Sequence, residues 1–209
     1  MTRLTARLVS AFLVLVPLGV EAQDRRHEED ALALARICVS EAGWNCWDTG
    51  DGMAIHEVIL RGAERHDMRY VTYARAYSRR ATGAVPMTGA RAWLPMLNAA
   101  GTQPANWPEH SYRRRSDGTV AVTPHPPWSR YRESWLAILA RAREVVRSLS
   151  LENAIEWSSC ARPVHDWGGA MDRERAERIG LVEVSCGETQ NDFYCRPGVD
   201  PECTEASGG

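Results

Sequence analysis

Six cysteines constrain the fold of this 209-residue chain more than any other feature of its sequence. No two of them form the Cys-x-x-Cys spacing that is typical of a zinc cluster, and an even number in an exported chain predicts disulfides. We therefore expect three bonds, with Cys186 and Cys195 as a candidate pair across a short hairpin. The alternative for Cys38 is a buried thiol, because this residue falls on an apolar helix face. The six are Cys38, Cys46, Cys160, Cys186, Cys195 and Cys203.

The start of the chain indicates export. Arg3 and Arg7 precede an apolar run at residues 8–20, which is shorter than the roughly 20 residues that a membrane-spanning helix needs. Val20 and Ala22 then place small side chains at positions −3 and −1 of a signal peptidase cleavage site. We predict a signal peptide at residues 1–22 and a periplasmic or secreted protein with no membrane anchor after cleavage. A retained anchor is the alternative.

The remaining sequence predicts one mostly helical domain at residues 23–198, followed by a loose tail at residues 199–209. Apolar residues recur at steps of three and four from Tyr131 to Leu149, which is the clearest helix pattern in the chain. Residues 101–128 are polar and rich in proline, which predicts a long connection that is functional or mobile. With a small β element the fold class is α+β. Helices are expected at about residues 31–43, 52–65, 70–77, 90–99, 131–149 and 172–179, and strands at 181–184 and 192–195.

The composition excludes several classes of chemistry. All 25 basic residues are arginine, so neither a lysine Schiff base nor a P-loop lysine can be formed. The net charge of −2 argues against a nucleic-acid binder, which would carry a basic domain. His56 and Glu57 begin like a zinc-protease motif, but Leu60 stands where the second histidine is required. We expect no metal and no organic cofactor.

Glu41 is the first candidate for chemistry. Ala31, Leu34, Cys38 and Glu41 follow at steps of three, four and three, so they share one helix face and a carboxyl lies at the end of an apolar stripe. Burial there raises the pKa of the carboxyl and keeps it protonated, as a general acid for glycosidic cleavage requires. The alternative is a helix-end glutamate that faces water or pairs with an arginine.

Two stretches carry a family resemblance. Residues 34–42 read Leu-Ala-Arg-Ile-Cys-Val-Ser-Glu-Ala, and the apolar segments 52–55 and 58–60 follow; near the C-terminus, residues 187–194 read Gly-Glu-Thr-Gln-Asn-Asp-Phe-Tyr. Together they resemble the opening and closing motifs of spore-cortex-lytic (SleB-type) cell wall hydrolases. That family is similar to the lysozyme-like lytic transglycosylases. The resemblance implies a lysozyme-like domain in which Glu41 is the catalytic glutamate.

The chain departs from the family pattern at two places. Glu41-Ala42 runs into Gly43-Trp44-Asn45, where the family usually continues to a second glutamate, and Asp192 replaces the closing histidine. A lysozyme would need a second carboxylate, and the nearest acids after Glu41 are Asp48 and Asp51. Both lie in a turn that is typical of a helix cap. We therefore favour the single-glutamate mechanism of a transglycosylase over hydrolysis.

Other residues are candidates for contact with the glycan. Tyrosines flank the cleft in lysozyme-like transglycosylases, tryptophan rings stack on sugars, and amides bind N-acetyl groups; a place in the protein core is the alternative for the aromatic residues. The loop at residues 165–169, His-Asp-Trp-Gly-Gly, has glycines that permit close approach of a ligand. The expected substrate-binding residues are Tyr73, Tyr77, Ser78, Trp167, Gln190, Asn191 and Tyr194.

The sequence as a whole predicts a monomeric enzyme that cleaves peptidoglycan glycan strands between N-acetylmuramic acid and N-acetylglucosamine. It indicates neither nucleic acid nor a stable membrane contact as a partner. Two alternatives belong to other classes. One is a saccharide-binding or structural envelope protein of the same fold without catalysis, and the other is a peptidoglycan peptidase that uses Cys160 and His165.

Overall fold

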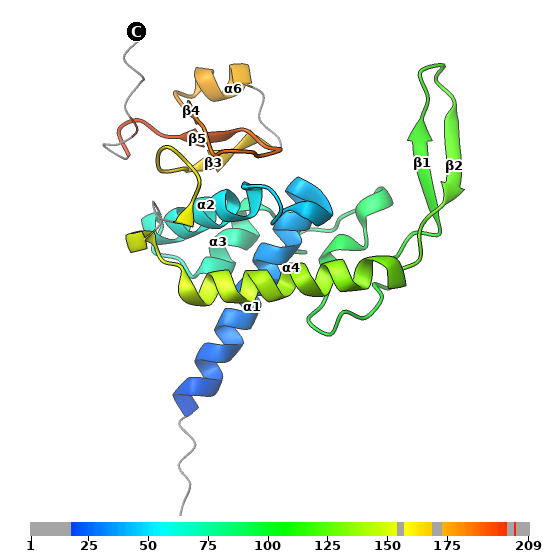
Figure 1. Ribbon diagram of the computed structural model, residues 1–209, viewed down its shortest axis with the longest axis horizontal. Helices are drawn as coiled ribbons and strands as arrows, with labels where there is room; N and C mark the ends of the chain where they lie inside the picture. The colour runs from blue at the N-terminus through cyan, green and yellow to red at the C-terminus, as the bar shows by residue number, and fades with distance from the viewer. Residues whose placement is uncertain (1–17, 154–156, 169–172, 200–202, 204–209) are drawn as a thin grey trace, which may run out of the picture.

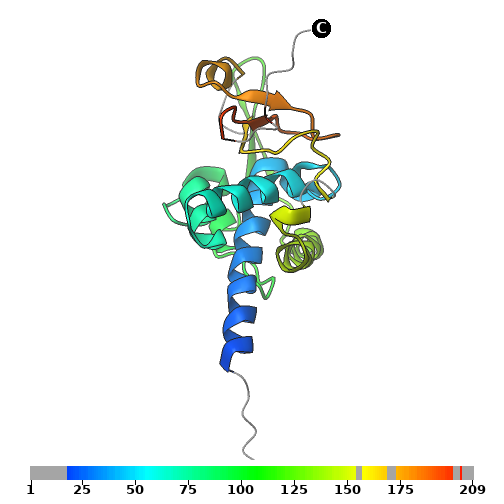
Figure 2. The ribbon, with the colours of Figure 1, turned by 90° about the vertical axis from the view of Figure 1, so that its left-hand side faces the viewer.

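A computed structural model describes residues 18–153, 157–168, 173–199 and 203 of the chain. Its centre is formed by α1 (Leu18–Ala42), which α4 (Ser129–Ser148) crosses (Figure 1). The C-terminal half of α1 is buried, whereas the first turns project from the body of the protein (Figure 2). The predicted cleavage point after residue 22 therefore falls within a continuous helix. Residues 1–17 of the predicted signal peptide lie outside the described residues.

The buried stripe of α1 matches its sequence pattern. Ala31, Leu34 and Cys38 are fully buried, and Glu41 follows them on the same face. In α4, Trp135, Ile138, Ala142 and Val145 are buried, while Tyr131 and Leu149 at the two ends pack against the core. Both helix predictions are confirmed, and the two helices pack against each other.

Two shorter helices complete the helical part. α2 (Asp51–Arg65) and α3 (Tyr70–Tyr77) pack against each other and against α1. Their close approach depends on Gly62, where an added Cβ would clash with the ring of Tyr73. The two helices agree with the predicted ranges. The expected helix at residues 90–99 is instead a pair of 3₁₀ turns, η2 (Gly89–Arg91) and η3 (Leu94–Met96), because Pro95 cannot donate a helical hydrogen bond.

The C-terminal part forms a three-stranded antiparallel sheet in the order β3-β5-β4. The predicted strand pair is confirmed as β4 (Val182–Val184) and β5 (Phe193–Cys195). The two-residue strand β3 (Asp166–Trp167) was not predicted and pairs with the other edge of β5. The short helix α6 (Arg173–Arg178) lies beside the sheet (Figure 1) and agrees with its prediction.

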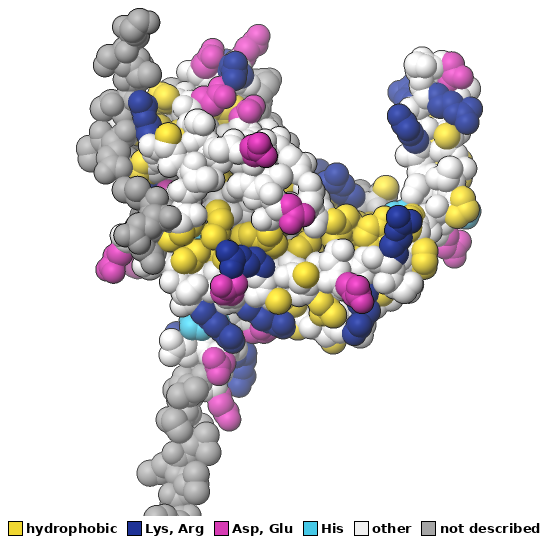
Figure 3. Space-filling model, viewed as in Figure 1, with side chains coloured by type: hydrophobic (Ala, Val, Ile, Leu, Met, Phe, Trp, Pro, Cys, Tyr) yellow, Lys and Arg dark blue, Asp and Glu magenta, His cyan; other side chains and the backbone are white. Residues whose placement is uncertain are grey.

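A second β element stands apart from the core. β1 (His110–Arg114) and β2 (Val120–Pro124) form an antiparallel hairpin that projects from one end of α4 (Figures 1 and 3). We call residues 110–124 the arm. The hairpin lies within the long connection predicted at residues 101–128, and its two strands were not predicted because each has only five residues in a proline-rich segment. The remaining 3₁₀ helices are η1 (Gly43–Asn45) and η4 (Leu151–Asn153).

All six cysteines form disulfides, so the prediction of three bonds is confirmed. The candidate pair Cys186–Cys195 was wrong, since Cys195 lies opposite Val182 in the antiparallel register and Cys186 follows two residues beyond the other end of that ladder, at Val184. Cys38 is not a buried thiol either. The three bonds are Cys38–Cys46, Cys160–Cys186 and Cys195–Cys203.

The described helices include none that is long and apolar enough to cross a membrane. Three disulfides are compatible with a periplasmic or extracellular location, because thiols pair in oxidising compartments. In the expected tail, Cys203 is buried and bonded to Cys195. Residues 200–202 and 204–209 lie outside the described residues.

Candidate functional site

Glu41 lies in the last turn of α1, where the buried stripe meets the surface. Burial raises the pKa of its carboxyl, while hydrogen bonds with the side chains of Trp167, Ser40 and Ser78 and the charge of Arg91 lower it; burial is the largest of these effects, and the net shift is upward. The position at the end of an apolar stripe was predicted from the sequence and is confirmed. The carboxyl therefore holds its proton to a higher pH than an ordinary glutamate does.

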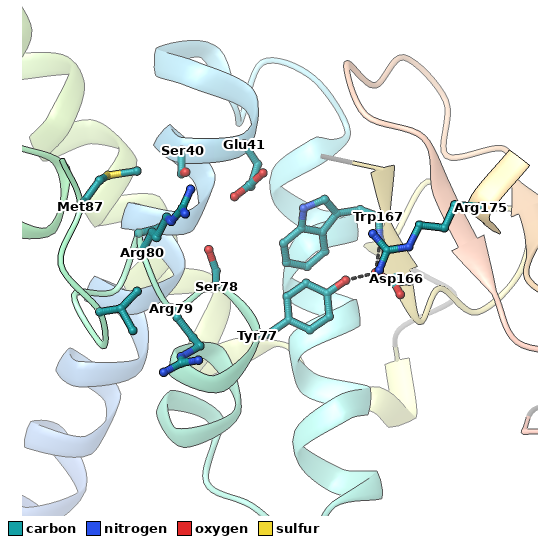
Figure 4. A pocket seen from close by; sticks show the side chains of 12 residues that line it. Ser40, Glu41, Tyr77, Ser78, Arg79, Arg80, Met87, Asp166, Trp167 and Arg175 are labelled. Atoms are coloured by element: carbon teal, nitrogen blue, oxygen red, sulfur yellow. Dashed lines mark hydrogen bonds between the residues drawn. The ribbon is translucent and has the colours of Figure 1, made fainter. Parts of the chain in front are cut away.

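A cavity of about 670 Å³ opens in front of this carboxyl. α1 supplies Glu41, α3 supplies Tyr77, with Ser78 directly after it, and β3 supplies Asp166 and Trp167 (Figure 4). These elements are far apart in the sequence. The volume is within the usual range of ligand-binding pockets, which is roughly 300–1,000 Å³.

Two aromatic rings form the wall of the cavity next to Glu41. The rings of Tyr77 and Trp167 are in contact, with centroids 4.4 Å apart. The Tyr77 hydroxyl donates a hydrogen bond to the carboxylate of Asp166, which also accepts one from the backbone N–H of Trp167 at 2.9 Å. Figure 4 shows both rings between Glu41 and Asp166. The two acids therefore share the cavity without facing each other directly.

Asp166 is a second ionisable acid of the site. Burial raises the pKa of its carboxyl, while the Trp167 backbone hydrogen bond and the charges of Arg196 and Arg175 lower it. The sequence points to the loop at residues 165–169 through its glycines and does not indicate a role for this carboxyl. The sequence does place Asp166 directly before Trp167, which could have drawn attention to this acid. Nothing in the sequence, however, shows that these two residues form a strand beside α3.

The closing motif of the sequence, residues 187–194, holds β3 in place through backbone pairing. Asp166 pairs with Tyr194, and Trp167 pairs with Phe193 across the ladder. The backbone N–H of Gly168 donates to the carbonyl of Asp192 at 2.7 Å. Tyr194 and Phe193 are buried, so they hold the strand that carries the cavity residues and do not reach the cavity themselves.

Asp51 connects this motif to the helical part. Its buried carboxylate accepts hydrogen bonds from the backbone N–H groups of Gln190 and Asn191 at 2.8 and 3.1 Å. It also accepts them from the Asn191 amide and the Thr49 hydroxyl, both at 2.7 Å. The cap prediction was wrong, since the N-cap of α2 is Gly50 and makes no side-chain cap bond. Neither Asp51 nor the exposed Asp48 lines the cavity.

The structure brings together four of the residues that were predicted from the sequence: Glu41, Tyr77, Ser78 and Trp167 line one cavity. The other four lie outside it. Tyr73 contacts Tyr77 and His66, and the Gln190 amide donates to Asn45 at 3.2 Å. Asn191 binds Asp51, and Tyr194 is buried in the sheet. We keep the first four in the candidate site.

Arginines line two parts of the cavity. Arg79 and Arg80 follow Ser78 directly, and Arg175 of α6 lies on the other side of the rings, near Asp166 (Figure 4). None of these was predicted, because arginines occur throughout the sequence and nothing in it distinguishes these three. Their positive charge lies at both ends of a cavity whose two acids have raised pKa values.

The peptidase alternative loses its nucleophile. Cys160 is bonded to Cys186 and offers no thiolate, and the His165 ring accepts a hydrogen bond from the backbone N–H of Arg196 at 3.3 Å. Comparison of the chain with protein-family models, with curated proteins and with solved structures gives no significant match. The assignment of function therefore rests on the site itself.

Proposed function

We propose that this protein is a peptidoglycan-cleaving glycosidase in which Glu41 is the general acid. The observation that carries the proposal is the half-buried Glu41 carboxyl, whose pKa is raised, at the wall of a cavity with aromatic rings. A carboxyl that stays protonated can protonate the oxygen of a glycosidic bond. The rings of Tyr77 and Trp167 beside it offer apolar faces to a sugar.

In the transglycosylase mechanism Glu41 acts twice. Its proton passes to the glycosidic oxygen between N-acetylmuramic acid and N-acetylglucosamine, the bond to the muramyl C1 breaks, and the N-acetylglucosamine end leaves as an alcohol. The Glu41 carboxylate then takes the proton of the muramyl C6 hydroxyl as that oxygen bonds to C1. A 1,6-anhydro ring forms, and Glu41 is protonated again.

The position of Asp166 supports this single-glutamate mechanism. A second carboxylate that attacks the sugar or activates water would stand across the substrate from the acid, about 5–5.5 Å away for retention and 6.5–9.5 Å for inversion. Asp166 lies behind the rings of Tyr77 and Trp167 as seen from Glu41 (Figure 4) and is held by the Tyr77 hydroxyl. We infer that it positions Tyr77.

Hydrolysis is the second candidate, because Asp166 does line the same cavity. If water is the nucleophile, Asp166→Asn should abolish cleavage as completely as Glu41→Gln does. If Asp166 only positions Tyr77, Asp166→Asn should retain part of the activity, and the products should keep their anhydro ends.

Zymography on a gel that contains peptidoglycan tests the proposal. We expect a clearing band for the wild type and none for Glu41→Gln, since glutamine fills the same space without a proton to give. Glu133→Gln on α4 is the matched control, because Glu133 is exposed and outside the cavity. A folded Glu41→Gln variant with wild-type clearing would contradict the role of Glu41. A wild type that binds peptidoglycan without clearing would favour the non-catalytic envelope protein.

A further inference from the structure

Two arginines at the cavity have no function in the chemistry above. Arg79 and Arg80 stand at the end of α3, directly after Ser78, and both line the cavity that Glu41 faces. Both are exposed. Figure 4 shows the side chain of Arg80 extending toward the end of the cavity formed by Ser40 and Glu41.

Neither guanidinium has an acceptor among the described residues, which is also true of the exposed Arg130 and Arg132; Arg79 and Arg80 differ from that pair in lining the cavity. Arg36 donates to the Leu97 carbonyl, and Arg143 binds the carboxylate of Glu28 through two nitrogens. The side chains of Arg79 and Arg80 extend in different directions from neighbouring positions of the chain (Figure 4), and each guanidinium is free to bind an anion from outside the protein.

The loop that carries the two arginines is ordered by its own hydrogen bonds. The backbone N–H of Val85 donates to the carbonyl of Arg79 at 3.1 Å, and the Thr82 hydroxyl donates to the Ser78 carbonyl at 2.9 Å. Gly83 has a φ of +78°, which glycine adopts without strain. The loop therefore holds the backbone of both arginines in place before a ligand arrives, which lowers the entropic cost of binding.

We propose that Arg79 and Arg80 form a subsite for a carboxylate of the glycan. Guanidinium groups recognise carboxylates through paired, charge-assisted hydrogen bonds. Muramic acid carries a lactyl group that ends either in a free carboxylate or in a peptide with carboxylates of its own, whereas chitin carries neither. The subsite makes the protein select muramyl glycans over neutral N-acetylglucosamine polymers. This inference rests on the proposed function for its substrate.

Binding to the inactive Glu41→Gln variant, measured by isothermal titration calorimetry, tests the subsite. Three soluble probes of six sugars are compared: chitohexaose, a muramyl glycan without peptides, and a muramyl glycan with its peptide stems. We expect at least tenfold tighter binding of a muramyl probe than of chitohexaose. The difference between the two muramyl probes shows whether the lactyl carboxylate or the peptide is bound.

Arg79→Gln with Arg80→Gln, added to Glu41→Gln, should remove this preference and leave chitohexaose affinity within about twofold. Arg130→Gln with Arg132→Gln is the matched control, since it removes the same charge from exposed positions of α4 outside the cavity. It should keep the preference. Equal affinity for neutral and anionic probes, no binding of any probe, or a preference that survives the Arg79 and Arg80 changes would overturn the subsite.

The two proposals fail in different assays. Cleavage of peptidoglycan by the wild type is measured separately from binding. If the wild type does not cleave but the carboxylate preference depends on Arg79 and Arg80, catalysis is refuted and the subsite is supported. If the wild type cleaves and the double change leaves the preference intact, the subsite is refuted and catalysis stands.

Discussion

The two β elements of this protein differ in how they are held. In the sheet β3-β5-β4, Phe193, Tyr194 and Cys195 of the central strand are all buried. Two disulfides connect this sheet to segments outside it. Cys186, just after β4, is bonded to Cys160, and Cys195 in β5 is bonded to Cys203. In the arm, by contrast, most residues are exposed on both faces. Tyr112 and Val122 lie opposite each other and are 66% and 55% exposed.

This difference separates the stability of the site from that of the arm. An isolated two-stranded hairpin is marginally stable in water, whereas a sheet packed on a core folds with it. β3 supplies Asp166 and Trp167 to the cavity, so whatever loosens the sheet should also disturb the site. Changes in the arm should affect neither the core nor the cavity. The following changes test this contrast, beginning with the largest expected effect.

Removing the Cys160–Cys186 bond should have the largest effect on stability. The bond closes a sequence separation of 26 residues, and its loss should cost about 3.5 kcal/mol on the chain-entropy model. The Cys195–Cys203 bond spans 8 residues and should contribute about 2.5 kcal/mol on the same model. Urea unfolding of the two double-serine variants measures both values. Equal stability of the wild type and the Cys160→Ser, Cys186→Ser variant would contradict a sheet held by this bond.

Asp51→Ala should have the next largest effect on stability. The change leaves the backbone N–H groups of Gln190 and Asn191 without their acceptor, and a hydrogen bond to a charged group contributes about 1.5–3 kcal/mol. We expect a loss of about 3 kcal/mol in the free energy of unfolding. Asp48→Ala, at an exposed position three residues earlier, should change it by less than about 0.5 kcal/mol. Similar values for the two variants would refute the role of Asp51.

Glu41→Gln should stabilise the protein at neutral pH. The pKa of Glu41 is raised in the folded state, so stability is lost as pH rises from its ordinary value through the raised one. Glutamine does not ionise and avoids this loss. Thermal unfolding should show a higher Tm for the variant at pH 7 and little difference at pH 3. A lower Tm at pH 7 would mean that the carboxylate stabilises the fold.

Changes in the arm should have the smallest effect. Tyr112→Ser with Val122→Ser removes exposed apolar surface from one face of the hairpin, and surface substitutions usually alter stability by less than about 0.5 kcal/mol. Urea unfolding and the clearing of peptidoglycan should both match the wild type. A loss as large as that from the disulfide variants would show that the arm folds with the core.

The sequence predicted the features that depend on residues close together along the chain. The stripes of α1 and α4 repeat over several turns, so their helices, buried faces and the position of Glu41 could be read from spacing alone. The Asp51–Asn191 contact joins residues 140 apart, and no local pattern signals it. The disulfide pairing failed for the same reason, because it depends on the register of β4 and β5. Asp166, Arg79 and Arg80 could not be selected, since Asp166 reaches the cavity only through the placement of β3 beside Tyr77, and Arg79 and Arg80 only through the packing of α3 on α1.

Product analysis in ¹⁸O-labelled water tests the central claim most directly. The wild type and Glu41→Gln are incubated with peptidoglycan, and the released fragments are analysed by mass spectrometry. If Glu41 acts alone, the wild type releases 1,6-anhydromuramic ends, which are lighter by one water than reducing ends and carry no label. Glu41→Gln releases no such ends. Reducing muramic ends that carry ¹⁸O and exceed those of an incubation without enzyme would contradict this account, because they would show that water is the nucleophile.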